Sequence, residues 1–547
     1  MINYIDQLTR TIRADWDNKA LCDWHGEEFT FAELASNIER LHILFENTGV
    51  QKGDKITIYA ANSARWATTF LAINTSGAVA VPLLSDFTGE AVGNLVNHSE
   101  SIALFTDKDS WKRLDVEKMT GLRFVVCTSD WSLLWAADDK VKAAFEGLDA
   151  AFKARFPKGV TKEDVNYHID DMTDLAVINY TSGTTSAPKG VMLRYECFSA
   201  SVDFAIRHIP ASSKDNIVSM LPMGHIYGMV FEFMYPLVSG VTVYYLGKTP
   251  AASTLLKAVG EVKPYIVITV PLVMEKVYNS SLKPIVKKWY MKMLCAIPGI
   301  NKILFKAIRG KLITAFGGNV KQFIMGGAAL NPDVEKFFRK IGLPFTVGYG
   351  MTEAAPLLAY AEPWIFKPGS CGRKLDSCEV RIDSEDPENI TGEILAKGTN
   401  ICSGYFKNPE ASENLFTEDG YLHTGDLGVM DKDGNITIKG RCKTMILSAN
   451  GQNIYPEEIE AGINSMDYVS ESLVVDRSSK LVALVRLDED AIKKAALSEQ
   501  DVHDLPEQIR RKINRTQPSY SQITKVEVKR DTFDKTPKGS IKRFLYN

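Results

Sequence analysis

The chain has 547 residues and a formal net charge of −3, and 45% of its residues are hydrophobic and 24% charged. This composition is globular, and the length predicts about three or four domain-sized units. The nearly balanced charge excludes an overall field that favours nucleic acid. The eight cysteines are scattered without a C-x-x-C pair, which argues against a zinc site and favours reduced, cytosolic thiols.

The sequence shows neither a signal-like start nor a membrane span. Its first residues lack a basic region followed by an apolar core. No uninterrupted apolar run is long enough to cross a bilayer. We therefore expect a soluble, cytoplasmic protein, with a peripheral position at the inner face of the membrane as the alternative.

Residues 21–180 show the alternation of strand and helix that builds a parallel sheet. Thr30 and Glu33 form a capping box, and apolar residues then recur at helical spacing as far as Phe45. Residues 52–83 have the pattern of strand, helix and strand, and strand-like runs recur afterwards. Such βαβ units predict an α/β fold in which helices cover a parallel sheet.

Residues 175–190, LAVINYTSGTTSAPKG, join an apolar strand to small hydroxyl residues and glycine. Glycine allows close backbone approach, N–H and hydroxyl groups donate hydrogen bonds, and Lys189 supplies a charge, so the run suits a phosphate chain. It is not a Walker loop, because Lys189 precedes Gly190. A flexible surface loop is the alternative, but that loop would need neither the apolar strand nor Pro-Lys-Gly. The candidate ligands are Thr181, Ser182, Gly183, Thr184, Thr185 and Lys189.

Residues 217–228, IVSMLPMGHIYG, place His225 in an irregular loop after a strand. Because α/β proteins tend to carry their sites at such strand ends, we favour a functional His225 over a structural one. The next residues, GMVFEFMYPL, contain one acidic residue, Glu232.

The segment 283–311 contains eight basic residues and no acidic one, interleaved with aromatic and aliphatic residues. Such a segment can lie in a bilayer interface, with its apolar groups in the lipid and its lysines near the phosphates. An ordinary pair of amphipathic helices with a solvated basic face is at least as good an interpretation. We therefore carry peripheral membrane contact as a hypothesis.

Two further strands end in small residues, KQFIMGGAAL at 321–330 and PFTVGYGMTE at 344–353. A flat ring can lie on the backbone of Gly327 and Ala328, and Tyr349 can stack on its other face. Glu353 suits Mg²⁺, which prefers one or two carboxylates together with phosphate oxygens. Two ordinary βα turns are the weaker alternative.

The last quarter of the chain carries a third set of motifs. YLHTGDLG at 421–428 contains Asp426, an Asp-Gly hairpin follows and ends at Arg441 and Lys443, and SANGQNIYPEEIE at 448–460 contains Gly451. Beyond them we expect a β-hairpin, a charged helical region over 490–515 and a short strand at ITKVEV.

Together, these motifs and their order resemble the adenylate-forming (AMP-binding) superfamily, in particular long-chain fatty acid–CoA ligases. The resemblance covers nearly the whole chain. It implies a large N-terminal AMP-binding domain of layered α/β subdomains (1–439) and a small, mobile C-terminal α+β domain (440–547), with the hinge near Lys443.

The resemblance also implies roles for individual residues. His225 would orient the reacting carboxylate, Asp426 and Arg441 would bind the ribose, and Thr184 and Glu353 would lie at Mg²⁺. Gly451 would face the thiol substrate of the second step. The residues implied at the nucleotide are Thr181, Ser182, Gly183, Thr184, Thr185, Lys189, Gly327, Ala328, Tyr349, Gly350, Met351, Thr352, Asp426 and Arg441.

The sequence departs from the superfamily at the C-terminal motif of that superfamily, which is close to T-P-x-G-K-I-x-R. In relatives the lysine of this motif contacts the carboxylate and the α-phosphate. In this chain Ser540 stands in its place. If this segment is extended, residues 538, 540 and 542 point to one face, with an offset of about 7 Å. We expect Lys538 to substitute, with Lys542 as the alternative.

The implied reaction is ATP-dependent activation of a carboxylic acid, through an acyl-AMP, to an acyl-CoA thioester, with Mg²⁺, ATP and coenzyme A. Apolar surroundings favour a medium- or long-chain fatty acid. Three alternatives stay open: transfer to a carrier-protein thiol, activation of an amino or aryl acid, and an impaired acyl or nucleotide binder in which Ser540 abolishes catalysis. Glu232 keeps an amino acid in consideration, because relatives that activate amino acids usually carry an aspartate nearby.

Overall fold

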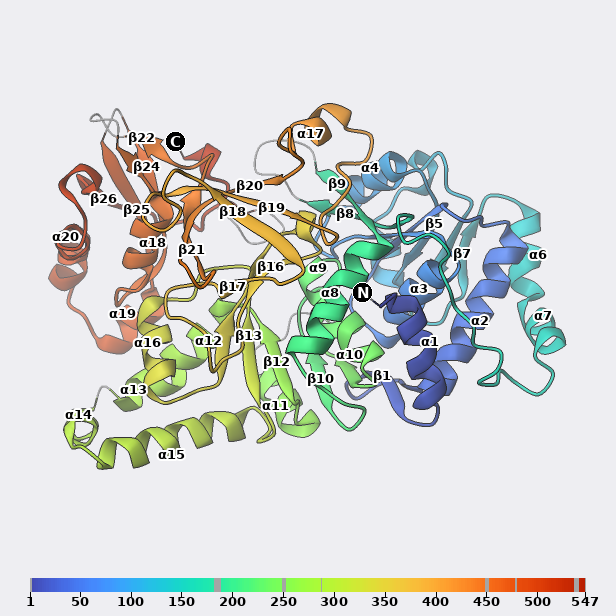
Figure 1. The fold of residues 1–547 in the computed structure, drawn as a ribbon, viewed down its shortest axis with the longest axis horizontal. Helices are drawn as coiled ribbons and strands as arrows, with labels where there is room; N and C mark the ends of the chain where they lie inside the picture. Colours follow the sequence, from blue (N-terminus) through green and yellow to red (C-terminus); the bar gives the residue numbers. More distant parts are fainter. Residues whose placement is uncertain are drawn as a thin grey trace.

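The computed structural model describes residues 2–181, 188–247, 252–286, 288–447, 452–477, 480–535 and 541–546, without the side chains of Ala252 and Lys292. Among these residues, two seven-stranded sheets form the body of the protein and a three-stranded sheet forms a separate C-terminal domain. Figure 1 shows the N-terminal sheet on the right and the C-terminal domain on the left. The predicted α/β class with a large and a small domain is confirmed.

The first seven-stranded sheet has the order β7-β6-β5-β3-β4-β8-β9. Its five central strands are parallel, and β7 and β9 add antiparallel edges. The strands are β3 (Lys55–Tyr59), β4 (Val79–Pro82), β5 (Ser101–Thr106), β6 (Phe124–Cys127), β7 (Leu133–Ala136), β8 (Leu175–Thr181) and β9 (Lys189–Arg194).

The second seven-stranded sheet has the order β14-β13-β12-β10-β11-β1-β2 and is parallel except for β2. Because parallel strands end at the same edge, the loops after β10, β13 and β14 open on one side of this sheet. The strands are β1 (Lys19–Asp23), β2 (Glu28–Thr30), β10 (Asn216–Ser219), β11 (Thr242–Tyr245), β12 (Ile266–Thr269), β13 (Gln322–Met325) and β14 (Phe345–Val347).

Some helices of the N-terminal domain, α2 and α3 among them, start at side-chain caps, whereas α7, α8, α9 and α10 have no side-chain cap. Thr30 and Glu33 form the predicted capping box of α2, and Gly49, in the left-handed region at φ 72°, ends that helix. Ser63 caps α3. These helices are α1 (Tyr4–Ala14), α2 (Phe31–Thr48), α3 (Ala64–Thr75), α4 (Gly89–Ser99), α5 (Lys108–Trp111), α6 (Asp139–Glu146), α7 (Leu148–Arg155), α8 (Tyr195–His208), α9 (Ile226–Gly228), α10 (Tyr235–Val238), α11 (Ala252–Val262) and α16 (Pro332–Lys340).

A group of helices between β12 and β13 forms a projection at the lower left of Figure 1. It contains the basic segment found in the sequence. α12 (Pro271–Val277) leads into it, and its elements are α13 (Lys283–Val286), α14 (Trp289–Ala296) and α15 (Ile300–Ala315), which together span the basic segment 283–311.

Two small antiparallel sheets join the body to the C-terminal domain. They contain β15 (Tyr349–Gly350), β16 (Leu357–Tyr360) and β17 (Arg373–Lys374), and β18 (Cys378–Asp383), β19 (Gly392–Gly398), β20 (Leu422–Met430) and β21 (Ile436–Arg441), with α17 (Pro409–Glu413) beside them.

The C-terminal domain has the predicted hairpin, helical region and last strand. These are β24 (Val469–Asp476), β25 (Leu481–Leu487), α19 (Glu489–Ala495), α20 (Glu499–Asn514) and β26 (Lys525–Val528), preceded by β22 (Ile446–Leu447), β23 (Asn453–Ile454) and α18 (Pro456–Asn464). No helix among the described residues of the whole chain meets the length and apolarity that a membrane span requires.

Candidate active site

Tyr349, Asp426 and Arg441 meet at the junction of the small sheets. The Tyr349 hydroxyl donates to Asp426 Oδ2 at 2.9 Å, and Arg441 Nε lies 3.2 Å from Asp426 Oδ1. The β20–β21 hairpin places Asp426 directly opposite Arg441. Arg441 is 65% exposed, whereas Asp426 and Tyr349 are buried. The arrangement therefore presents one buried carboxylate beside an open guanidinium.

Burial dominates the electrostatics of this group. It raises the pKa of Asp426 above its usual value, and Arg441 and the Tyr349 hydroxyl oppose that rise. Burial and the Asp426 charge hold the pKa of Tyr349 well above its usual value, so the phenol remains the donor of the pair. The charge of Glu353 also acts on Asp426, which indicates that the two predicted carboxylates belong to one region.

Glu353 is connected to the predicted phosphate loop through Tyr405. The Tyr405 hydroxyl donates to Glu353 Oε1 at 3.0 Å, and Lys189 Nζ lies 4.7 Å from the centroid of the Tyr405 ring. The edge of β9 holds this segment, because Phe406 N donates to Gly190 O at 2.8 Å. Burial and the Glu353 charge raise the pKa of Tyr405. The sequence analysis missed Tyr405, since only this contact between distant segments reveals it.

The residues present fit Mg²⁺ bound together with a phosphate chain. Glu353 is the predicted carboxylate ligand, and the described residues contain no group of three or more His, Cys, Asp or Glu side chains able to hold a metal. Mg²⁺ is usually held by one or two carboxylates plus substrate phosphates, whereas an all-protein cage would need more ligands. The second predicted ligand, Thr184, lies outside the described residues.

Three polar side chains fix the loop that carries His225. Asn62 Nδ2 donates to Leu221 O at 2.7 Å, and Asn62 Oδ1 accepts from Met223 N at 2.9 Å. Asn179 Nδ2 donates to Gly224 O at 2.8 Å. The loop, which follows β10, is therefore tied to β8 and to the segment after β3, and His225 precedes the first turn of α9.

Glu232 is the third of these side chains. Its Oε2 accepts from Met220 N at 3.0 Å and from Leu221 N at 2.8 Å, the two amides that follow β10. The side chain is completely buried, and desolvation holds its pKa well above its usual value. A fully buried carboxyl with an oxygen committed to two backbone amides is a loop anchor and a poor partner for a substrate amine.

The loops after β13 and β14 have the openness that a planar ligand requires. Gly327 and Ala328 are exposed, and Gly327 has φ 82°, a conformation that favours glycine. A side chain on Gly350 would place Cβ 1.8 Å from Pro356 O. Met351 and Thr352 are half-buried between Gly350 and Glu353. Tyr349 uses its hydroxyl on Asp426, and stacking of its ring on a base stays a prediction.

Several predicted residues lie outside the described part of the chain. Of those that are described, Lys189 pairs with Thr181 across β8 and β9, and Lys443 is exposed in the turn after β21. Lys535 and Ile541 form an antiparallel bridge, and Lys542 N donates to Asp534 O at 2.8 Å. The residues outside the description are Ser182, Gly183, Thr184, Thr185, Gly451, Lys538 and Ser540.

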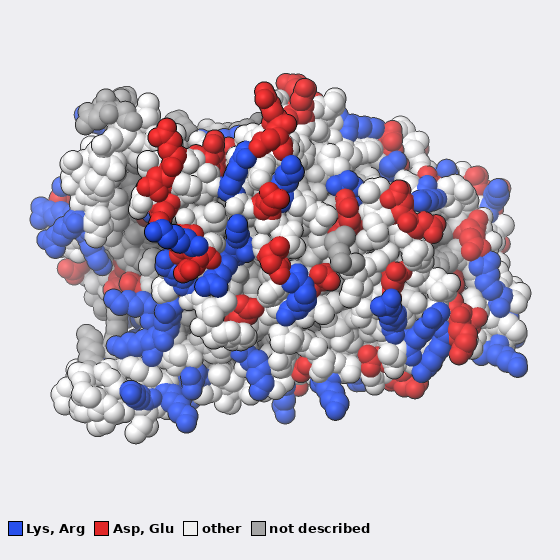
Figure 2. Space-filling view, viewed as in Figure 1, with Lys and Arg blue, Asp and Glu red and all other residues white. Residues whose placement is uncertain are grey.

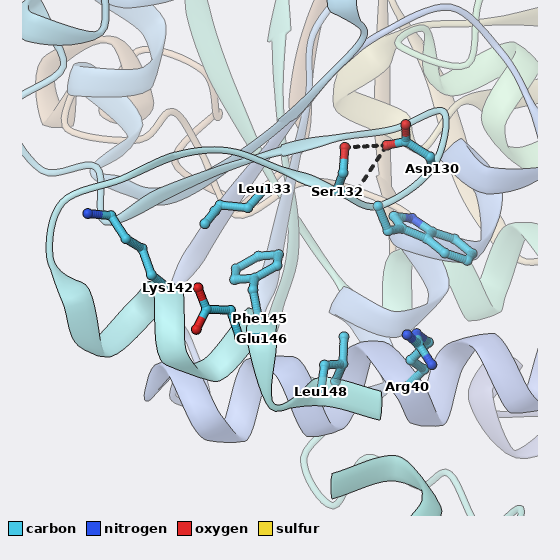
Figure 3. Close-up of a pocket in the computed structure, with 9 residues that line it drawn as sticks. Arg40, Asp130, Ser132, Leu133, Lys142, Phe145, Glu146 and Leu148 are labelled. Atoms are coloured by element: carbon cyan, nitrogen blue, oxygen red, sulfur yellow. Dashed lines mark hydrogen bonds between the residues drawn. The ribbon is translucent and has the colours of Figure 1, made fainter. Parts of the chain in front are cut away.

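A cavity of about 520 Å³ lies elsewhere, between α2, β7 and α6. Figure 3 shows Arg40, Phe145 and Leu148 around it. Two charged groups in its wall are paired with neighbours: Asp130 accepts from Ser132 Oγ at 2.5 Å and Lys142 Nζ lies 2.8 Å from Asp139. It has no convergent set of reactive groups, so we do not assign the chemistry to it.

The sequence matches two families. A family described as "AMP-binding enzyme" matches residues 8–406, and one described as "AMP-binding enzyme C-terminal domain" matches residues 443–546. The resemblance expected from the motifs is thereby confirmed.

Curated relatives include fatty acid ligases. The chain is 29% identical over 501 residues to long-chain-fatty-acid–CoA ligase FadD15 of Mycobacterium bovis, covering 86% of this chain and 79% of that protein. It is 28% identical to long-chain-fatty-acid–CoA ligase 4 of Saccharomyces cerevisiae, covering 78% and 67%. It is also 26% identical to the chloroplastic long-chain-fatty-acid–[acyl-carrier-protein] ligase AEE15 of Arabidopsis thaliana, covering 86% and 74%.

Solved structures share the fold. ATP-bound MatB from Rhodopseudomonas palustris superposes with a TM-score of 0.76 at 22% identity, covering 100% of this chain and 98% of that one. The anthranilate CoA ligase AuaEII in complex with anthranoyl-AMP gives a TM-score of 0.80 at 19% identity, covering 100% and 96%.

Proposed function

Because the chain belongs to the AMP-binding enzyme family, we propose that it activates a medium- or long-chain fatty acid with ATP and transfers the acyl group to coenzyme A. The observation that carries this proposal is the convergence of predicted nucleotide residues. Tyr349 and Arg441 both contact Asp426, while Lys189 and Glu353 meet through Tyr405.

The proposed chemistry has two steps. A carboxylate oxygen attacks the α-phosphorus of ATP, the bond to pyrophosphate breaks, and an acyl-AMP forms. The thiol sulfur then attacks the acyl carbon, its proton is lost, and the bond to AMP breaks. The carboxylate alone is a poor acyl donor, because its leaving group would be oxide; adenylation replaces it with AMP.

Each residue of the candidate site has its own proposed role in these two steps. Asp426 accepts from the ribose hydroxyls, with Arg441 beside it, and Lys189 neutralises phosphate charge. His225, on its fixed loop, orients the acid. Glu353 would hold Mg²⁺ together with phosphate oxygens, and the ion would supply charge neutralisation at the phosphates when bound.

The nature of the acid is supported by relatives and by Glu232. Two of the relatives above are named long-chain-fatty-acid–CoA ligases, which favours a fatty acid. The burial and backbone hydrogen bonds of Glu232 weigh against an amino acid, because this carboxyl already binds backbone amides and is not open to a substrate amine. A carrier-protein thiol is the second candidate acceptor, because AEE15 is named an acyl-carrier-protein ligase.

The second step would use the C-terminal domain. We propose that rotation near Lys443, after the end of β21, exchanges the face presented to the site and brings Gly451 towards the thiol. This places the domain boundary close to residue 440. In the adenylation step Lys538 would supply the charge that Ser540 lacks.

ATP–pyrophosphate exchange screened over carboxylic acids tests the function. We expect exchange with medium- or long-chain fatty acids, and acyl transfer to coenzyme A in preference to a carrier protein when both compete. Exchange with an amino or aryl acid only would replace the substrate class. No exchange with any acid, despite ATP binding, would identify a nucleotide binder and overturn the proposal.

Lys538→Ala tests the substitution for Ser540, with Lys542→Ala as its matched variant. We expect Lys538→Ala to lower exchange by about 10²–10³-fold and to spare thioester formation from supplied acyl-adenylate. If Lys542→Ala lowers exchange and Lys538→Ala does not, Lys542 is the residue that substitutes for the missing lysine. Unchanged exchange in both variants would contradict a lysine substitute.

A further inference from the structure

The helical projection, defined as residues 283–311, exposes large apolar side chains beyond those its fold uses. Trp289 and Ile303 are each 74% exposed and Met293 is 58% exposed. Ile285, Tyr290, Ile297 and Ile300 are also exposed. Exposed apolar residues that gather in one segment are typical of an interaction surface.

The arrangement of α15 explains why these residues are left in water. Its inward stripe, Phe305, Ile308 and Leu312, is buried in the core next to β13 and α16. Ile303 and Ile300 lie at the start of the same helix but outside that stripe, beside the turn that leads from α14. The helix therefore has one apolar face that holds it to the protein and, at its start, a second pair of apolar residues that is exposed.

Basic side chains border the exposed apolar surface. Lys288, Lys302, Lys306 and Lys311 are exposed, and the projection contains eight Lys or Arg residues and no Asp or Glu. Figure 2 shows an uncharged knob at the lower left, the position of α14 in Figure 1, with lysine and arginine nearby. Whatever covers this surface must offer apolar contact together with negative charge.

An open, largely apolar hollow lies between the projection and α16. A cavity of about 280 Å³ is lined by Val286, Phe305 and Phe337, with Lys340 at its wall. Lys340 Nζ lies 5.1 Å from the centroid of the Phe305 ring. The combination of apolar wall and lysine is therefore repeated on the inner side of the projection.

We propose that the helical projection binds the surface of a bilayer that contains anionic lipids. Trp289, Met293 and Ile303 enter the interface, and the lysines contact lipid phosphates. No helix among the described residues meets the requirements of a membrane span, so the contact is peripheral. The charge argument favours an anionic lipid surface over a second copy of this chain, whose projection would carry the same positive charge.

This proposal goes beyond the proposed function and is tested without acid, ATP or coenzyme A. The full chain is sedimented with phosphatidylcholine vesicles that contain or lack phosphatidylserine. We expect binding only to the anionic vesicles, and weaker binding as ionic strength rises. If the unmodified chain shows no ATP–pyrophosphate exchange but binds the anionic vesicles, the proposed function is wrong and this inference stands.

Two variants and two matched controls separate the charge from the apolar contribution. Lys288/Lys302/Lys306→Glu should weaken vesicle binding on the order of 100-fold. Trp289→Ser/Ile303→Ser should weaken it by about tenfold or more. The controls are Lys140/Lys153/Lys158→Glu, three exposed lysines at the α6–α7 end, and Trp364→Ser, a tryptophan that is 76% exposed.

The controls should bind vesicles as the unmodified chain does. Equal loss in the two lysine variants, or no binding of the unmodified chain to anionic vesicles, would overturn the proposal. Sedimentation velocity measures the oligomeric state and tests whether a second copy of the chain covers the surface instead. If the unmodified chain is a dimer and Trp289→Ser/Ile303→Ser is a monomer, a second copy covers the surface and the membrane proposal fails.

Discussion

The candidate nucleotide region and the helical projection use polar and apolar side chains in opposite ways. In the first, Asp426 and Glu353 are buried, and each accepts a tyrosine hydroxyl at about 3 Å. In the second, Trp289 and Ile303 are exposed and lysines surround them. Buried carboxylates that the fold already holds are suited to position a small ligand, whereas open apolar groups are suited to a large surface.

This difference in burial also predicts how each region responds to side-chain substitution. Removing a buried group leaves its partners unsatisfied, which costs more than the lost contact alone. Removing an exposed apolar group changes the folded protein little and alters only what binds there. The variants below test this contrast.

The largest effect is expected at Asp426. Asp426→Ala should lower exchange activity by about 10²–10³-fold, because it removes the proposed ribose acceptor and leaves Tyr349 and Arg441 without their partner. Steady-state kinetics with varied ATP provide the measurement. Asp419→Ala, at an exposed aspartate paired with Arg381, is the control and should keep its activity. Equal activity of both variants would contradict a role for Asp426.

Two isoleucines on α15 provide a matched comparison of stability. Ile308 is 8% exposed, whereas Ile303 is 74% exposed. Ile308→Ala should lower the free energy of unfolding by about 2–5 kcal/mol, because it leaves a cavity in the core. Ile303→Ala should change it by less than about 0.5 kcal/mol. Urea unfolding measures both, and similar losses would show that Ile303 has a partner in the folded protein.

A smaller effect is expected at Tyr405, the contact between Glu353 and Lys189. A hydrogen bond to a charged group contributes about 1.5–3 kcal/mol, so Tyr405→Phe should lower kcat/KM for ATP by roughly 10-fold or more. The Mg²⁺ concentration needed for half-maximal rate should rise. Tyr421→Phe removes a similar bond to Glu379 at the surface and should leave both quantities unchanged. A fall in activity with an unchanged Mg²⁺ requirement would separate Tyr405 from the proposed metal site.

The pH dependence of Asp426 should have opposite signs for stability and for binding. Its raised pKa means that the folded protein favours the protonated carboxyl, so its contribution to stability falls as pH rises from its usual pKa through the raised one. ATP affinity should rise over the same range, because the ionised carboxylate is the better acceptor for ribose. Unfolding and ATP titrations at a series of pH values, from just below the usual pKa of an aspartate upward, measure both trends. Asp426→Asn should abolish them, and persistence of the trends in that variant would assign them to another group.

The smallest effect is expected where the projection touches the C-terminal domain. Lys283 Nζ lies 2.9 Å from Asp467 Oδ1, and both side chains are partly exposed. Such pairs contribute about 0–1 kcal/mol. Lys283→Ala should therefore change the ratio of exchange to thioester formation by less than about fivefold. A larger change would indicate that the projection controls the position of the C-terminal domain.

Sequence patterns identified the local elements because their signals are short in range. The capping box of Thr30 and Glu33, the strand that ends at Thr181 and the hairpin after Asp426 all depend on residues a few positions apart. The motif order also sufficed for the family.

The sequence could not show which side chains of distant segments meet. Tyr405 contacts Glu353 across 52 positions, and no pattern around Tyr405 predicts that contact. Glu232 was considered for a substrate amine, yet it holds the backbone after β10. A glutamate looks the same in the sequence whether it binds a substrate amine or anchors a loop. Only the packing around it distinguishes the two roles.

By itself, then, the sequence determined the α/β class and the family and proposed the candidate residues, because periodicity and capping act between near neighbours and the motifs are short. The tertiary structure decided that Asp426 has buried partners and that Ile303 is exposed while Ile308, five residues later, is buried. The physical reason is that burial depends on which elements pack against a helix face, and that packing is a property of the whole chain.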